Sequence, residues 1–277
     1  MRGSEFVETF KGKSLPGWEA AALQLAREGS VVPWGTVNLA LTSPATKGHA
    51  AHSAVLPVTS DLFAIGTKED FLRLPLTPLT AQAIANLSGQ LLPTPKIAQA
   101  IWRAAGESPA GVQLMPTPQP NKGASLAEFA RHDAAIRKQL AALGDPHLAG
   151  KLVTGHKKDV VISNIVKKGR VVIYGWFYPN GKTPPGASQP IQVRSNAHFD
   201  DSFLDYSHGI RFVSPTMTVD GATMRTEDVL QDPELSLLLS DEGPVRQVRY
   251  PAPNAPAPLR PAMLSVYQVL SDVAYRP

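Results

Sequence analysis

Proline is the feature of this sequence that most limits the folds open to it. The chain has 26 prolines among 277 residues, which is roughly twice the usual share. Each proline fixes its φ angle and removes a backbone donor, so it ends helices and disrupts the interior of regular sheets. We therefore expect short helices and strands joined by many fixed turns, and neither a coiled coil nor a bundle of long helices.

Composition excludes several classes of protein. Hydrophobic residues make up 43% of the chain and charged residues 18%, as in ordinary globular proteins. No run approaches ~18 uninterrupted apolar residues, so no membrane span is expected. Because there is no cysteine, disulfides, Cys-ligated zinc and thiol nucleophiles are excluded. The net charge of +4 favours an anionic substrate, but the dense Lys/Arg stripe of a nucleic-acid-binding protein is missing.

The spacing of apolar residues, caps and turn signals predicts an α+β fold. Its N-terminal half is helix-rich around a small irregular sheet, and its C-terminal half is β-rich with mainly antiparallel strands. The clearest helix begins after Ser125, where Glu128 completes a capping box. Helices are predicted at 18–28, 79–91, 96–105, 125–143, 226–239 and 262–274. Strands are predicted at 36–42, 53–58, 62–66, 71–76, 151–163, 170–178, 191–194 and 210–219.

These elements suggest three regions. Residues 7–145 form the helix-rich region, residues 146–245 the β-rich region, and residues 246–277 a proline-rich extended arm with a C-terminal helix. The alternative is one compact domain with a shared core. Residues 1–6 resemble a vector-derived leader, so we place them outside the fold. A secreted or periplasmic location is favoured by the proline content and by the polymer-type site described next.

The densest chemistry lies at 195–211 (SNAHFDDSFLDYSHGIR), between two predicted strands. Imidazole and carboxylate groups can exchange protons or bind a divalent metal near neutral pH. We take His208, Asp205, Tyr206 and Arg211 as candidate catalytic residues. The alternative is a solvated loop whose aspartates cap turns.

A second polar group interrupts the apolar strand predicted at 151–163. It contains His156, Lys157, Lys158 and Asp159 after Gly155. In a strand, the first and third of these four face one side and the other two the opposite side. We expect His156 to join His198 and His208 in one cleft. The alternative is an edge strand protected by its lysines. The four remaining histidines, His49, His52, His132 and His147, are expected in loops, in a turn or on a solvated or domain-facing helix surface.

An aromatic strand could supply substrate contacts. Tyr174, Trp176 and Tyr178 alternate along one strand face, which indicates either core packing or a platform for a sugar or peptide. Lys158 would add a positive charge beside it.

Short motifs narrow the chemistry further. Ser207-His208-Gly209 resembles the start of the Ser-His-Gly-Cys motif of L,D-transpeptidases, but Ile210 replaces the cysteine, so that activity is excluded. His198 and Asp205 have six residues between them, which is similar to the first two zinc ligands of the D-Ala-D-Ala-type metallopeptidases. This resemblance implies a zinc site with His198, Asp205 and a third histidine, either His156 or His208. P-loop, G-x-G-x-x-G, EF-hand and H-E-x-x-H motifs are absent.

Three functions remain open. The first is a hydrolase of an extracellular or cell-wall-type polymer, either a peptide or a glycan. In one version, zinc held by His198, Asp205 and His156 activates water. In the other, His208 acts as a base that Asp205 orients, and Arg211 stabilises the negative charge that develops. The second is a polysaccharide lyase with Tyr206 or His208 as base and Arg211 and lysines neutralising the uronate carboxylate. The third is a non-catalytic ligand-binding module. The substrate is a small molecule or polymer, not a nucleic acid.

Overall fold

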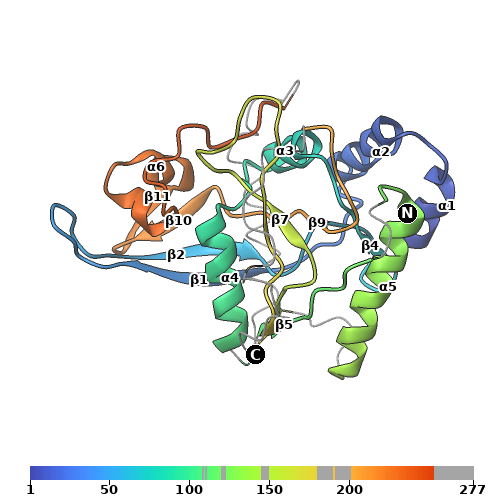
Figure 1. Ribbon diagram of the computed structural model, residues 1–277, viewed down its shortest axis with the longest axis horizontal. Helices are drawn as coiled ribbons and strands as arrows, with labels where there is room; N and C mark the ends of the chain where they lie inside the picture. Colours follow the sequence, from blue (N-terminus) through green and yellow to red (C-terminus); the bar gives the residue numbers. More distant parts are fainter. Residues whose placement is uncertain are drawn as a thin grey trace.

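The computed structural model describes residues 1–107, 109, 111–119, 123–144, 150–179, 190 and 201–252. It has the predicted mixture of helices and small sheets and confirms the α+β class. A long β-hairpin extends to one side of the body, and the N-terminal helices with α5 lie on the opposite side (Figure 1). The predicted strand at 191–194, the arm beyond residue 252 and the helix at 262–274 fall outside the described residues.

Side-chain caps mark the starts of two long helices, α5 and α4. Ser125 caps α5 by accepting a hydrogen bond from the Glu128 N–H at 3.3 Å, and the Glu128 carboxylate returns one from the Ser125 N–H at 3.2 Å. Thr94 accepts the Ile97 N–H at 3.1 Å at the start of α4. Such caps satisfy backbone donors that have no partner inside the helix. The helices are α1 (Gly3–Phe10), α2 (Leu15–Arg27), α3 (Pro78–Leu87), α4 (Pro95–Glu107), α5 (Leu126–Ala142), α6 (Thr226–Gln231) and the 3₁₀ helix η2 (Leu235–Leu238).

The largest sheet joins strands from both halves of the sequence. Its order is β1 (Thr36–Ser43), β2 (His52–Thr59), β10 (Thr216–Val219) and β11 (Ala222–Arg225), all antiparallel. Asp220 and Gly221 turn the chain between the last two strands with φ angles of 48° and 85°, as the Asp-Gly signal predicts.

Three small sheets complete the structure. β3 (Ala64–Gly66) pairs with β4 (Phe71–Arg73), and β5 (Gly111–Gln113) pairs in parallel with β6 (Leu152–Thr154). The third sheet has the order β8 (Ile173–Gly175), β7 (Lys158–Val160) and β9 (His208–Gly209). β7 is therefore a central strand, and it carries the polar residues that the sequence singles out.

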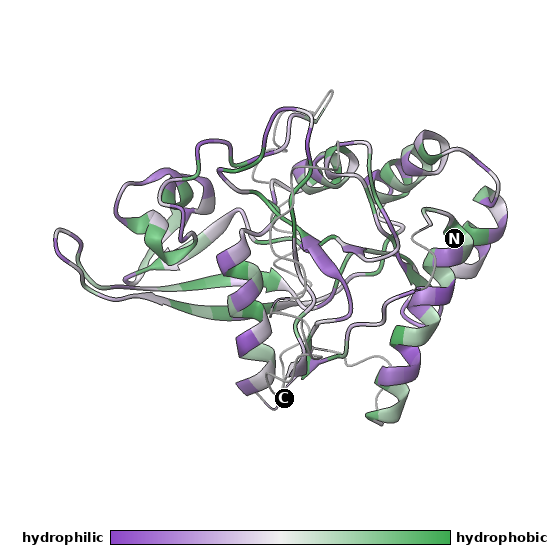
Figure 2. Cartoon of the chain, viewed as in Figure 1, coloured by the Kyte–Doolittle hydropathy of each residue, from purple (hydrophilic) through white to green (hydrophobic). Residues whose placement is uncertain are grey.

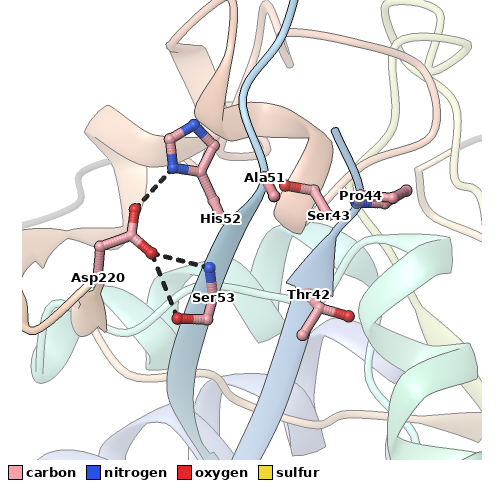
Figure 3. A pocket seen from close by; sticks show the side chains of 7 residues that line it. All are labelled: Thr42, Ser43, Pro44, Ala51, His52, Ser53 and Asp220. Atoms are coloured by element: carbon pink, nitrogen blue, oxygen red, sulfur yellow. Dashed lines mark hydrogen bonds and ion pairs between the residues drawn. The ribbon is translucent and has the colours of Figure 1, made fainter. Parts of the chain in front are cut away.

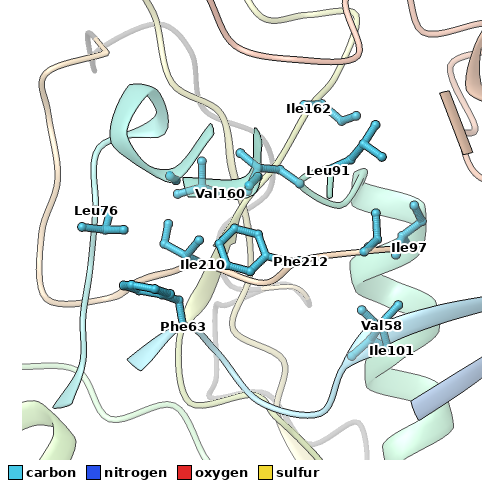
Figure 4. Close-up of a cluster of buried hydrophobic side chains, with 14 of the residues drawn as sticks. Val58, Phe63, Leu76, Leu91, Ile97, Ile101, Val160, Ile162, Ile210 and Phe212 are labelled. Carbon is cyan, nitrogen blue, oxygen red and sulfur yellow. The ribbon is translucent and has the colours of Figure 1, made fainter. Parts of the chain in front are cut away.

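A single large core cluster holds these elements together. Figure 4 shows side chains from β2, α4, β7 and the segment after β9 meeting in it. Val58, Ile101, Val160, Ile210 and Phe212 are among its buried members. Strands and core residues thus come from both sides of residue 145, while the predicted division into regions itself stays a prediction.

The N-terminal residues belong to the fold, so their predicted exclusion is wrong. The Phe6 side chain is completely buried, and the Gly3 N–H donates to the Asp70 carbonyl at 2.8 Å. A Cβ at Gly3 would lie 2.4 Å from the carbonyl carbon of Phe71. Gly3 allows the close approach, and helix α1 uses Phe6 as its anchor.

Among the described residues, no helix has the length and apolar character that crossing a membrane requires.

Candidate functional site

Pairing of β7 with β9 brings the two polar segments of the sequence together. The strands run parallel, with Lys158 opposite His208 and Asp159 opposite Gly209. Residues opposite each other in a sheet share a face, so Lys158 and His208 lie on one side and Asp159 on the other. Figure 2 shows β7 as a hydrophilic strand in the middle of the molecule. Its central position contradicts the edge-strand alternative.

Gly155 decides where this strand begins. Its φ angle is 92°, and a Cβ there would lie 2.3 Å from the Leu114 carbonyl oxygen and 2.5 Å from the Trp102 ring. The chain therefore bends at residues 155–157, and the predicted strand 151–163 divides into β6 and β7. His156 and Lys157 lie in the bend. The predicted alternation holds only for Lys158 and Asp159, because His156 and Lys157 lie outside the strand, and all four residues are buried.

His208 is a completely buried imidazole, and neither ring nitrogen has a hydrogen-bond partner within the described chain. Burial lowers the pKa of His208 to about 4, with the nearby Asp205 carboxylate opposing this and Lys158 and Lys157 adding to it. The ring is therefore neutral at physiological pH and keeps a nitrogen lone pair. The Phe203 ring, which is partly exposed, packs against it at 5.7 Å between centroids.

Asp205 is the carboxylate closest in sequence to this ring. It accepts the Ser207 N–H at 2.7 Å and also the Ser207 hydroxyl. Burial raises the pKa of Asp205, but the positive charge of His208 when protonated, Lys158 and the Ser207 hydrogen bonds outweigh it and hold the pKa below its usual value. Asp205 is therefore ionised, and the Ser207 hydroxyl donates to it rather than to His208.

The guanidinium group of Arg211 is hydrogen-bonded to backbone carbonyl groups. It donates from Nη1 to the Thr59 carbonyl at 2.5 Å and from Nη2 to the Val153 carbonyl at 2.6 Å. Its Nε lies 3.9 Å from Asp159 Oδ1, on the face of the sheet opposite His208. Burial raises the pKa of Asp159 to about 6 against the influence of Arg211. Arg211 thus ties three chain segments together, and its Nη groups are not free for a substrate.

Tyr206 turns its hydroxyl to the backbone as well. The oxygen accepts the Gln119 N–H at 2.8 Å, and burial raises the pKa of the phenol. The ring packs against His132 at 4.9 Å and Trp176 at 6.3 Å between centroids. A phenol that stays protonated is a poor base.

Helix α5 supplies a histidine that the sequence analysis placed on a surface. His132 is buried, with Nδ1 3.0 Å from Lys157 Nζ and Nε2 2.9 Å from Thr117 Oγ1. Burial lowers the pKa of His132 to about 2. The expected solvated or domain-facing position is therefore wrong. The helical spacing of the sequence could have shown this, because Phe129 and Ile136, three residues before His132 and four residues after it, lie on the same buried face of the helix.

Lys157 is a buried amine. Its Nζ donates to the Tyr206 carbonyl and contacts His132. Burial lowers its pKa to about 7, although the carboxylates of Asp133 and Asp205 oppose the shift. It is therefore partly neutral at physiological pH.

His156 contacts a buried ionic network rather than standing alone. Arg73 donates to Asp61 at 2.6 Å and to Asp133 at 3.0 Å. His156 Nε2 lies 3.3 Å from Asp61 Oδ1, and burial lowers its pKa. Asp61, Arg73 and Asp133 were missed by the sequence analysis because each lies in a different element. Only the single arginine inside the apolar run at 71–76 hinted at this network.

The three aromatic residues do not share a strand face, so that expectation is wrong. β8 ends at Gly175, and Trp176 has a φ angle of 62°. Tyr174 packs with Phe177, at 5.8 Å between centroids, beside Trp102. Trp176 lies in the main core, where Lys158 Nζ is 4.6 Å from its ring centroid. Tyr178 is half-buried. Contact of any of them with a substrate stays a prediction.

The predicted zinc ligands are only partly described. His198 lies outside the described residues, as does His147. Asp205 is engaged by Ser207 and His156 by Asp61. Within the described chain, no three His, Asp or Glu side chains are grouped so that they could hold a metal ion.

A wide, open surface pocket of about 580 Å³ lies elsewhere, near the tip of the β1–β2 hairpin and beside the β10–β11 turn (Figure 3). Its lining includes Ser43, His52 and Asp220 and none of the predicted site residues.

Comparisons with family models, curated proteins and solved structures found no match to this chain. Function must therefore be argued from the side chains alone.

Proposed function

We propose that this protein is a hydrolase that cleaves an amide bond in a cell-wall-type or other extracellular peptide polymer, with His208 as general base. The observation that carries the proposal is the buried, neutral His208 ring without a hydrogen-bond partner, beside an ionised Asp205. Buried polar atoms in proteins are nearly always paired, so an unpaired pair of ring nitrogens needs an explanation such as catalysis.

In this proposal His208 accepts a proton from a water molecule as the water oxygen bonds to the substrate carbonyl carbon. The proton then passes to the amine that leaves when the C–N bond breaks. Asp205 stabilises the imidazolium that forms in between, because its carboxylate is close enough to interact with the charge that His208 gains on protonation. Lys158, opposite His208 on the same sheet face, supplies positive charge for the oxyanion.

Peptide hydrolysis fits the geometry better than the alternatives. Glycosidases generally use two carboxyl groups that flank one bond, whereas Asp205 is bound by Ser207 and Asp159 lies near Arg211 on the sheet face opposite His208. The version of the lyase that uses Tyr206 as base and Arg211 as cation is disfavoured, because both side chains are bound to the backbone. The version that uses His208 and a lysine is distinguished from hydrolysis by the products of the reaction.

The test is an assay on purified peptidoglycan with three readouts: new amino groups, new reducing ends, and unsaturated ends that absorb ultraviolet light. We expect amino groups to appear, and His208→Gln to lower their rate of release by roughly 10²–10⁴-fold. The rate should fall as the pH drops through about 4, because a base must be unprotonated. His49→Gln, in the hairpin tip, is the matched control and should leave the rate unchanged.

Each other outcome counts against the proposal. Reducing ends would indicate a glycosidase, and unsaturated ends a lyase. A folded His208→Gln variant with unchanged activity would remove His208 from the mechanism. Absence of all three products, with retention of the polymer by the protein, would favour the binding module.

A further inference from the structure

The tip of the β1–β2 hairpin, residues 44–51, is tied to the body next to the pocket in Figure 3. Two carboxylates make these ties. Glu234, just before η2, accepts the Ala50 N–H at 2.7 Å. Asp220, in the β10–β11 turn, accepts the Ser53 N–H at 2.9 Å and lies 2.6 Å from His52 Nδ1.

His52 is placed between both acids. Its Nδ1 faces Asp220, and its Nε2 lies 3.3 Å from Glu234 Oε1. A neutral imidazole carries only one N–H, whereas the imidazolium has two donors. Both ring nitrogens can therefore donate to the two carboxylates at the same time only when the ring is protonated. Within the described chain these are the ionic partners of His52, and His49 is the other titratable group that acts on Glu234.

We propose that His52 is a proton-operated clamp, which holds the hairpin tip against the β10–β11 turn and η2 when charged and releases it when neutral. Because His52 and Asp220 line the pocket, the clamp also sets the shape of that pocket. This inference is independent of the proposed hydrolase activity.

The direction of the pH dependence follows from the contacts. Hydrogen bonding to Asp220 and then to Glu234 raises the pKa of His52, and burial opposes this weakly. The pKa values of Asp220 and Glu234 are lowered first by the backbone N–H donors of Ser53 and Ala50, respectively, and then by His52. For a base with a raised pKa in the folded state, the stabilisation is complete below its ordinary pKa and is lost as pH rises through the folded value. The clamp is thus closed below the ordinary pKa of histidine and opens as the pH rises through the raised pKa of His52.

Nuclear magnetic resonance on the full chain tests the clamp through three probes: the His52 ring protons, and the Ala50 and Ser53 amides. We expect the His52 midpoint to lie above its ordinary value. We also expect exchange of the Ala50 amide, corrected for intrinsic base catalysis, to accelerate about tenfold as His52 loses its proton. Asp220→Asn, which keeps a residue tolerant of positive φ, should lower the His52 midpoint by about one pH unit.

His52→Gln separates the clamp from general pH effects. In this variant the corrected Ala50 exchange should be fast at every pH. The proposal is overturned if the His52 midpoint is at or below its ordinary value, or if Ala50 exchange in the wild type does not follow the titration of His52.

Discussion

At His208, burial and a neighbouring carboxylate act in opposite directions on one ring, and burial dominates. The result is a neutral histidine where an exposed histidine next to an aspartate would carry charge. Desolvation therefore keeps the His208 ring unprotonated, as its proposed role as a base requires.

Removing part of the apolar cover of His208 should return its pKa toward its ordinary value. Phe203→Ala deletes the ring that packs against His208 and admits water, so we expect the pKa to rise from about 4 toward 6.5. Ring-proton titration of His208 measures this, with Phe203→Leu as the control that keeps an apolar cover. An unchanged midpoint in Phe203→Ala would show that other side chains desolvate the ring.

Lys157 should make stability depend on pH in the alkaline range. Its folded pKa of about 7 lies below the ordinary lysine value of 10.5, so the unfolded chain binds more protons between these two values and stability rises with pH there. One proton contributes up to about 1.4 kcal/mol per pH unit. Urea unfolding from pH 7 to 10 should show this slope in the wild type and in Lys168→Met, an exposed control, but not in Lys157→Met. Equal slopes in all three proteins would contradict a depressed Lys157 pKa.

At the scale of elements, Gly155 divides the strand predicted at 151–163 and determines where the polar residues 156–159 lie. Had residues 151–163 continued as one strand, half of the polar group would have pointed away from the interior. The bend at Gly155 instead buries all four residues, which form contacts with α5, β9 and the Asp61–Arg73 pair.

Gly155→Ala should be far more destabilising than a glycine replacement in open space. Both Gly155 and Gly169 have positive φ angles, 92° and 71°, but only at Gly155 does an added Cβ meet backbone and ring atoms. We expect a loss of roughly 3 kcal/mol or more for Gly155→Ala and about 1 kcal/mol for Gly169→Ala. Chemical denaturation of both variants measures the difference. Similar losses would mean that the backbone angle alone matters.

At the scale of the whole molecule, segments far apart in the chain share one core. α1 packs beside β3 and β4, α5 lies against β4, and β2 pairs with β10. The buried Arg73 joins Asp61 to Asp133 across this core. Replacing one member alone would leave unpaired buried charge, which is costly in a medium of low polarity.

The N-terminal helix should therefore contribute to global stability. Phe6→Ala removes a completely buried ring and should lower the free energy of unfolding by roughly 3–5 kcal/mol. Glu8→Ala, on the exposed side of the same helix, should change it by less than about 0.5 kcal/mol. Thermal unfolding of both variants checks this. A Phe6→Ala protein as stable as the wild type would show that helix α1 does not contribute to the stability of the core.

The sequence by itself determined the features that depend on neighbours along the chain. Caps at Ser125 and Thr94, the Asp220–Gly221 turn and the β1–β2 strands follow from local backbone preferences, and so does the α+β class. Only the tertiary structure decided which charges meet. His156 pairs with Asp61, Lys157 with His132, and β7 with β9. Which partners meet depends on how the elements pack and on the cost of leaving buried charge unpaired. The spacing of residues along the chain shows neither the packing nor that cost.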